Sequence, residues 1–152
     1  MKPFRFRLDR LRRLKEAEQQ QRVLELGEAR RLLERRETEL NQAVERMEEA
    51  AIRYAELGTG ASSANDWQRA EAALKRDKLL ALKAADIARK AAENVEVVRE
   101  RLVAKSREVQ VYVRLRRRKR EQYELEMRRA EQKENDARAV ERHTQLVERA
   151  GR

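Results

Sequence analysis

The apolar residues of this chain recur at helical spacing in two long stretches, and one short polar segment separates them. Apolar positions spaced four and three residues apart keep one stripe of each helix facing a partner helix. The separating segment, residues 58–65, contains two glycines and two serines. The only proline is Pro3, so nothing beyond the first residues forces the backbone out of a helix. The pattern therefore predicts one helix over about residues 4–57, a turn at 58–65, and a second helix over about 66–147.

The first stretch carries a seven-residue repeat that predicts its packing seam. One seam position falls at Leu26, Leu33, Leu40, Met47 and Tyr54, and the alternate position at Val23, Arg30, Glu37, Val44 and Ala51. Because Arg30 and Glu37 are charged, we expect the seam to be weakest in the middle of this helix. Gly27 costs about 1 kcal/mol relative to alanine inside a helix. It is either a tolerated defect or a point of close approach between the helices.

The second stretch repeats with the same spacing, but small residues dominate its first half. Its predicted seam is Ala81, Ala85, Ala88, Ala92, Val95, Arg99, Leu102, Ser106, Val109 and Val113. A partner backbone could approach closely along the alanines. Asn65 and Asp66 are natural N-caps, because their side-chain oxygens can accept hydrogen bonds from the free amides of the next turn.

Two long helices joined by one turn predict an all-α fold, an antiparallel coiled-coil hairpin that spans residues 1–152 as a single elongated unit. With the turn as apex, residue i should face residue 123 − i, which brings Phe4 near Lys119. Alternatively, residues 66–80 form a separate short helix at the tip, and the pairing slides toward the C-terminus.

The composition favours helix over disorder. Asp, Glu, Lys and Arg make up 43% of the residues and aromatic residues only 4%, which suits a thin seam rather than a layered globular core. Disordered chains are usually rich in proline and glycine, whereas this chain has one proline and four glycines. It has no cysteine, no long apolar run and no secretory signal, so we expect a cytoplasmic protein.

The net charge of +10 is concentrated near the C-terminus. Residues 113–152 carry 13 basic and 8 acidic side chains, a net charge of +5. Their most basic segment is the run Arg114–Arg120. Such a run is usually a solvated helix face, but it can also bind an acidic protein surface or nucleic acid.

The residue types that carry catalysis do not occur in recognisable patterns. Acidic residues are interspersed with Lys and Arg at the spacing of surface ion pairs, and His143 is the only histidine. No glycine-rich phosphate loop or Ser/His/Asp set is evident. The sequence therefore predicts a protein that is not an enzyme and uses no metal or cofactor.

The N-terminal pattern Phe4-x-Phe6-x-Leu8-x-x-Leu11-x-x-Leu14-Lys15-x-x-Glu18 resembles the opening of the flagellar export-apparatus protein family FliJ. The helix that follows has the composition of that family at Leu26, Ala29, Leu33, Glu37 and Leu40. The C-terminal half is similar in its basic stretch, which ends at Tyr123, and in its later segment at residues 131–136. The resemblance covers nearly the whole chain.

This resemblance implies a non-enzymatic component of the bacterial flagellar type III protein export machine, peripherally associated with the inner-membrane export apparatus. Such proteins look like the central stalk of rotary ATP synthases. The resemblance implies insertion into the export ATPase ring as its regulator, contact with the export gate protein, and cycling of export chaperones. A stalk of the injectisome type III secretion system has the same architecture.

Two sets of contact residues follow for the two ends of the hairpin. The resemblance places the gate or chaperone contact at the tip, at Met47, Tyr54, Trp67 and Leu74. The basic charge favours the open end for the ATPase, at Phe4, Phe6, Leu8, Leu11, Arg116, Arg117, Arg118, Lys119 and Arg120. The alternatives are a basic arm that binds nucleic acid and a purely structural spacer, and a spacer would not need two chemically different ends.

Overall fold

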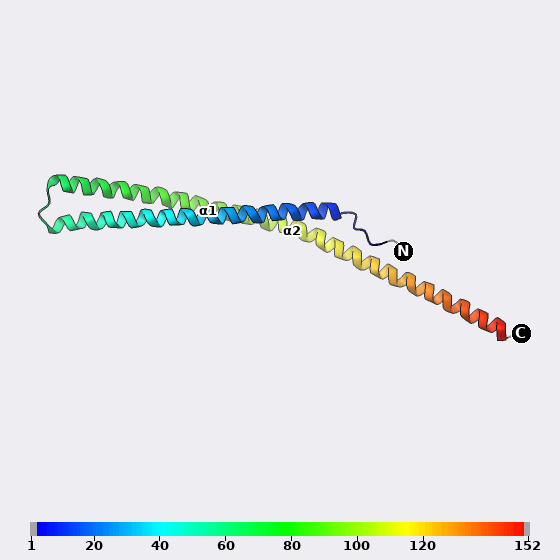
Figure 1. Ribbon diagram of the computed structural model, residues 1–152. Helices are drawn as coiled ribbons and strands as arrows, with labels where there is room; N and C mark the ends of the chain where they lie inside the picture. The colour runs from blue at the N-terminus through cyan, green and yellow to red at the C-terminus, as the bar shows by residue number, and fades with distance from the viewer. Residues whose placement is uncertain (1–2, 151–152) are drawn as a thin grey trace. The chain divides into compact units, whose positions relative to one another are not determined.

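The computed structural model describes residues 3–150, with side chains described for residues 3–147. Helix α1 spans Asp9–Glu56, the 3-10 turn η1 spans Leu57–Thr59, and helix α2 spans Ala64–Ala150 (Figure 1). The described residues contain no strand, so the all-α prediction is confirmed. Because α2 is continuous from Ala64, residues 66–80 do not form a separate tip helix.

Packing groups the residues into two compact units, each built from part of α1 and part of α2. One unit is Glu18–Lys105, and we call it the turn unit because it contains η1. The other combines the residues up to Ala17 with those from Ser106 onward, and we call it the basic unit for its charge, described below.

Within each unit the two helices run antiparallel in one register. In the turn unit Lys105 Nζ lies 2.9 Å from Glu18 Oε2. In the basic unit Lys15 Nζ lies 3.4 Å from Glu108 Oε2. Both pairs satisfy the relation that residue i faces residue 123 − i, which is the register expected for a turn at residues 58–65.

The seam of α1 differs from the sequence prediction at one of its two repeating positions. Leu26 is buried and packs with Ala29, Val95 and Val98, and Leu33 lies against this cluster. The alternate position is therefore Ala29, and after it the buried Ala43 and Ala50. The predicted alternate set was wrong, since Val23, Arg30, Glu37 and Ala51 are exposed and Val44 is only half-buried. Arg30 and Glu37 therefore lie outside the seam, but the seam position between Ala29 and Ala43 is occupied by the half-buried Arg36.

The same displacement occurs in α2. Ala81, Ala88, Val95 and Val109 are buried as predicted. The alternate position, however, carries the buried Ala91 and Val98. The predicted members Arg99 and Val113 are exposed, whereas Ala85, Ala92 and Ser106 are half-buried. Alanines at these positions leave room for a close partner backbone but bury little apolar surface each.

One carboxylate is buried in this alanine-rich seam. Asp77 is only 7% exposed and forms an ion pair with the neighbouring Arg76, whose Nε lies 2.9 Å from Asp77 Oδ1. The pKa of Asp77 is lowered, first by the hydrogen bond from Arg76 and further by the positive charges of Arg46 and Arg53. Three arginines thus keep this buried carboxyl in its charged form.

The turn is closed by a capping box at the start of α2. The backbone N–H of Asp66 donates to Ser63 Oγ (3.2 Å), and the N–H of Ser63 donates to Asp66 Oδ2 (3.1 Å). The N-cap is therefore Ser63, and Asp66 is its partner three residues later. The prediction that Asn65 or Asp66 is the N-cap was wrong, because the helix begins one residue before Asn65.

Candidate functional site

Two aromatic side chains meet beside the turn. The rings of Tyr54 and Trp67 lie 5.3 Å apart between centroids and are nearly perpendicular, at 88°. This edge-to-face geometry is a favourable arrangement for an aromatic pair. Trp67 is still 36% exposed, so the pair presents an apolar face beside the turn. The structure therefore brings together two of the four predicted tip residues.

The other two predicted tip residues contribute less to this surface. Met47 and Leu74 lie one heptad away from Tyr54 and Trp67 along their helices, and both are half-buried at seam positions. Ile52, two residues before Tyr54, is 58% exposed, but side chains two residues apart on a helix point to different sides, so it does not extend the Tyr54–Trp67 pair.

In the basic unit the residues before α1 are not helical, although the sequence predicted helix from about residue 4. The helix begins with Asp9, whose backbone N–H donates to the carbonyl oxygen of Phe6. In an extended segment alternate side chains point to opposite sides. Accordingly Phe4 and Phe6 are half-buried, whereas Arg5 and Arg7 are exposed.

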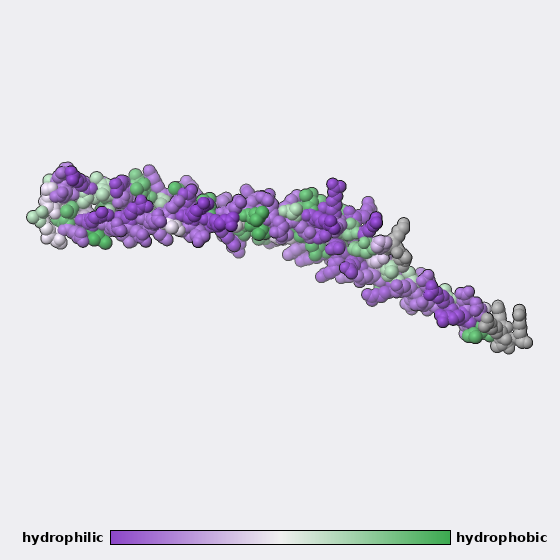
Figure 2. Space-filling model, viewed as in Figure 1, coloured by the Kyte–Doolittle hydropathy of each residue, from purple (hydrophilic) through white to green (hydrophobic). Residues whose placement is uncertain are grey.

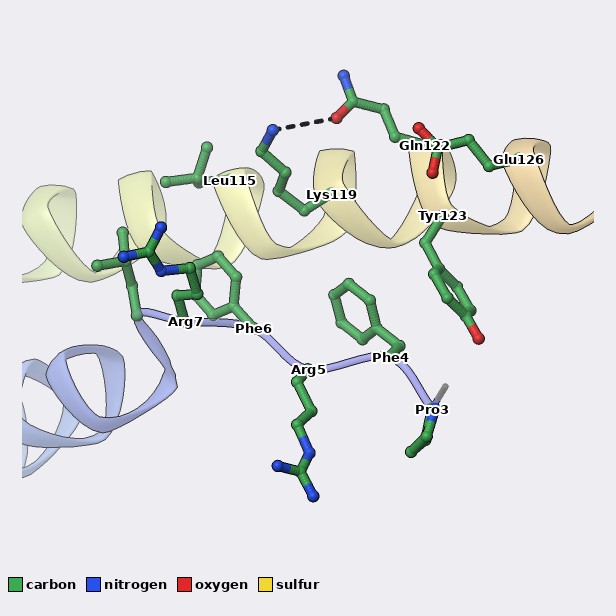
Figure 3. Close-up of a pocket in the computed structure, with 11 residues that line it drawn as sticks. Pro3, Phe4, Arg5, Phe6, Arg7, Leu115, Lys119, Gln122, Tyr123 and Glu126 are labelled. Carbon is green, nitrogen blue, oxygen red and sulfur yellow. Dashed lines mark hydrogen bonds between the residues drawn. The ribbon is translucent and has the colours of Figure 1, made fainter. Parts of the chain in front are cut away.

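Between this N-terminal segment and α2 lies a groove of about 990 Å³, which we call the N-terminal groove (Figure 3). In Figure 3 the rings of Phe4 and Phe6 lie toward α2, and Arg5 points away from it. The rings of Phe4 and Tyr123 are 5.6 Å apart between centroids. Lys119 lines the same groove, and its Nζ donates to Gln122 Oε1 at 3.2 Å.

Sequence reasoning placed Phe4, Phe6, Leu8 and Lys119 at one contact surface, and all four line this groove. It missed the residues that α2 contributes further along. The remaining lining residues from α2 are Leu115, Gln122, Tyr123 and Glu126. Phe4 reaches as far as Tyr123 because an extended residue covers about 3.3 Å, more than twice the 1.5 Å rise of a helical residue.

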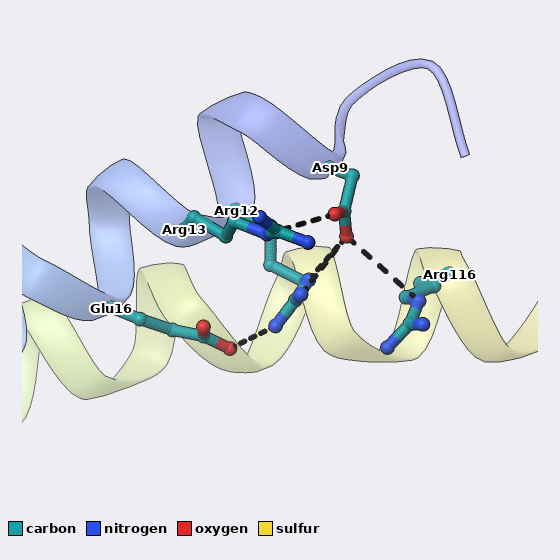
Figure 4. A network of polar contacts seen from close by, with 5 residues as sticks. All are labelled: Asp9, Arg12, Arg13, Glu16 and Arg116. Carbon is teal, nitrogen blue, oxygen red and sulfur yellow. Dashed lines mark hydrogen bonds and ion pairs between the residues drawn. The ribbon is translucent and has the colours of Figure 1, made fainter. Parts of the chain in front are cut away.

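A second groove of the basic unit, about 390 Å³, is lined mainly by arginines, and we call it the arginine groove. Asp9 lies at the centre of the charges beside it, within ion-pair distance of Arg12, Arg13 and Arg116 (Figure 4). The pKa of Asp9 is lowered, first by the hydrogen bond from Arg12 and further by the charges of Arg13 and Arg116. The lining residues are Arg12, Glu16, Val113, Arg116, Arg117 and Arg120.

The predicted basic run is therefore divided among different faces of α2. Lys119 lines the N-terminal groove, whereas Arg116, Arg117 and Arg120 line the arginine groove. Arg118 lines neither groove and is exposed. The predicted Leu11 is half-buried on α1 and also lines neither groove.

The net charge of the chain belongs entirely to one of the two units. Residues 18–105 carry 17 basic and 17 acidic side chains, so the turn unit is neutral. The rest of the chain carries 21 basic and 11 acidic side chains, which accounts for the whole charge of +10. Hydrophilic residues cover most of the face shown in Figure 2, and apolar residues appear there in separate spots.

No cluster of three or more His, Asp or Glu side chains that could hold a metal ion occurs in the part of the chain that the structure describes. Within the same residues, neither helix carries an apolar stretch of the length needed to cross a bilayer.

The fold defines the class of protein, an all-α chain built on two long helices that pack antiparallel within each unit. The family model for the flagellar FliJ protein matches residues 4–146, nearly the whole chain. The chain therefore belongs to the FliJ family, which makes it a component related to flagellar export. Comparison with curated proteins and with solved structures finds no match.

Proposed function

We propose that this chain is a non-enzymatic stalk of the flagellar type III export apparatus that links the export ATPase ring to the export gate and to export chaperones. Its position would be cytoplasmic, held at the inner-membrane apparatus through these partners. The observation that carries the proposal is the separation of charge, +10 in the basic unit and zero in the turn unit. We choose the flagellar system over the injectisome because the matching family is the flagellar FliJ protein.

The basic unit is the candidate contact for the ATPase ring. Its N-terminal groove combines the apolar rings of Phe4 and Phe6 with Lys119, and its arginine groove adds Arg116, Arg117 and Arg120. Buried aromatic side chains supply much of the binding energy at protein interfaces. Complementary charge favours a partner surface that is acidic. We expect acidic loops of the ATPase to contact this surface.

The turn unit is the candidate contact for the gate protein or a chaperone. The Tyr54–Trp67 pair is partly exposed in a neutral setting, so its contribution to binding should come from apolar burial rather than from charge. Trp and Tyr are enriched among the residues that dominate binding energy. Binding at this surface should therefore depend only weakly on salt.

A pair of variants of the full chain tests the proposal. Phe4→Ala removes the ring that packs against Tyr123, and Trp67→Ala removes the ring that packs edge-to-face with Tyr54. Binding of each variant to the purified export ATPase and to the export gate protein is measured by titration calorimetry. Phe4→Ala should weaken ATPase binding by about tenfold or more and leave gate binding unchanged, and Trp67→Ala should do the reverse.

The proposal is contradicted if each variant loses affinity for both partners equally, or if neither variant loses affinity for either partner. Nucleic acid is the alternative partner of the basic unit, because exposed arginines can neutralise phosphates. A DNA duplex of unrelated sequence that binds the chain tightly, while the ATPase is neither bound nor stimulated, would establish that alternative. A purely structural spacer predicts that neither aromatic substitution changes the binding of either partner.

A further inference from the structure

One face of α2 in the basic unit is covered by neither α1 nor the N-terminal segment. It is a row of six exposed side chains, spaced four, three, four, four and three residues apart along the helix. We call this face the outer stripe. Its members are Arg107, Val111, Arg114, Arg118, Gln122 and Leu125.

The outer stripe combines exposed apolar residues with unbalanced positive charge. Val111 is 61% exposed and Leu125 is 47% exposed. Arg107, Arg114 and Arg118 are exposed too, and the described residues offer none of them an ion pair. By contrast, Arg117 and Arg120, which lie off the stripe, pair with Glu121 and Glu124 four residues later.

The spacing of the stripe fits a helix as its occupant. Positions four and three residues apart form one straight row on a helix, and such a row packs against a second helix in a coiled coil. At 1.5 Å per residue, the row from Arg107 to Leu125 is about 27 Å long, enough for about five turns of a partner helix. The stripe contains no acidic residue, so the partner must supply the carboxylates.

Other polyanions fit the stripe less well. A bilayer surface is bound by a continuous apolar face, but Val111 and Leu125 are separated by two of the three arginines. Single-stranded nucleic acid needs exposed aromatic rings for stacking, and the outer stripe contains no aromatic residue. A DNA duplex would use the arginines but would leave the two aliphatic side chains exposed.

We propose that the outer stripe of α2 binds an acidic amphipathic helix of a partner protein, with its carboxylates on Arg107, Arg114 and Arg118 and its apolar residues on Val111 and Leu125. The stripe meets the N-terminal groove only at Gln122, because Arg107, Val111, Arg114, Arg118 and Leu125 line neither that groove nor the arginine groove. The inference does not depend on the stalk function.

The test uses the full chain and two labelled synthetic peptides of about 20 residues, enough for about five helical turns. The first peptide places Leu at a seven-residue repeat flanked by Glu, and the second has the same composition in a permuted order without the repeat. Fluorescence anisotropy measures binding of each. We expect the first peptide to bind at least about tenfold more tightly, because only it matches the stripe in both charge and spacing.

Two triple variants separate the stripe from general charge. The stripe variant carries Arg107→Glu, Arg114→Glu and Arg118→Glu. The matched control carries Lys133→Glu, Arg138→Glu and Arg142→Glu, which make the same change of charge on exposed positions further along α2. The stripe variant should bind the first peptide at least about tenfold more weakly, and the control should bind it within about twofold of the original chain. Circular dichroism checks that both variants remain helical.

A third variant, Val111→Ser with Leu125→Ser, keeps the charge and should also weaken binding. The proposal is overturned if the permuted peptide binds equally well, or if the control variant loses as much affinity as the stripe variant. It is also overturned if vesicles of anionic phospholipid or a DNA duplex displace the peptide and bind more tightly through the same arginines. A dimer of the chain that dissociates only in the stripe variant, seen by sedimentation, would make a second copy the occupant instead.

Discussion

The turn unit and the basic unit are built from the same two helices, yet they differ in charge and in the residues that pack between the helices. In the turn unit opposite charges balance, and the seam is lined largely by alanines such as Ala43, Ala50, Ala81 and Ala88. The basic unit carries the whole net charge, and its extended N-terminal segment forms an open groove against α2. Small seam residues favour close packing, whereas a change from helix to extended chain leaves space for a partner.

The ion pairs show the same contrast on a smaller scale. In the turn unit Arg89 pairs with both Asp86 and Glu93, each within one helical turn. Exposed pairs of this kind contribute little to stability, but they keep the surface neutral. In the basic unit Arg114 and Arg118 have no such partner among the described residues, so their charge is available to another molecule.

The largest expected effect is on the core of the turn unit. Leu26→Ala removes a side chain that is 8% exposed and packs with Ala29, Val95 and Val98. The cavity and the lost burial should reduce the free energy of unfolding by about 2–4 kcal/mol, measured by urea denaturation. Leu24→Ala is the matched control, because Leu24 is 62% exposed and its loss should change stability by less than about 0.5 kcal/mol. Equal effects of the two substitutions would contradict the observed seam.

The next effect concerns the cap that closes the turn. Ser63→Ala removes the oxygen that accepts the Asp66 N–H, which should lower the free energy of unfolding by about 1 kcal/mol. Asn65→Ala should leave it within about 0.5 kcal/mol, since Asn65 lies inside the helix and is exposed. Thermal unfolding followed by circular dichroism compares the two variants. If Asn65→Ala lowered the stability more than Ser63→Ala, the result would support Asn65 as the N-cap, as the sequence predicted.

A smaller effect of opposite sign is expected at Gly27. A Cβ atom there would meet only the far end of the Arg31 side chain, at 4.0 Å, so no helix approaches closely. Gly27→Ala should therefore raise the free energy of unfolding by about 0.5–1 kcal/mol, because alanine has the higher helix propensity. Urea denaturation measures the change. A destabilised variant would indicate the close helix approach that the structure does not show.

The smallest expected effect is the dependence of the cap on pH. Hydrogen bonds from Ser63 lower the pKa of Asp66 below its ordinary value of 3.8. A carboxyl whose folded-state pKa is lowered stabilises the fold above its unfolded pKa, and this stabilisation is lost as the pH falls through the folded pKa. Melting temperatures of the original chain and of Asp66→Asn should therefore differ at pH 6, and the difference should be lost only below pH 3.8, as the pH falls through the lowered pKa of Asp66. A difference that is constant across this range would contradict the role of the charged carboxylate.

The sequence predicts the helices, the turn and the register well, because helix-forming residues and a single polar segment leave few alternatives. It predicts only half of each seam. The repeat through Leu26 and Leu33 is clear, but the second seam position can precede or follow each leucine. Val23 is more hydrophobic than Ala29, yet Ala29 is buried in the cluster with Leu26 and Val23 is exposed.

The candidate site is less predictable for a different physical reason. The sequence prediction began the first helix at about residue 4, whereas the residues before Asp9 are not helical. The alternation of Phe with the exposed Arg5 and Arg7 was the available signal, since a period of two indicates an extended chain. The Tyr54–Trp67 contact follows from the register and was predicted as one patch.

The most direct test of the two-surface account is the salt dependence of binding to its two proposed partners. Titrations of the full chain with the export ATPase and with the export gate protein are repeated over a range of NaCl concentrations. The account predicts that ATPase affinity falls steeply with salt, because it depends on the exposed arginines, whereas gate affinity through the neutral turn unit changes little. Equal salt dependence for both partners, or a steeper dependence for the gate, would contradict it.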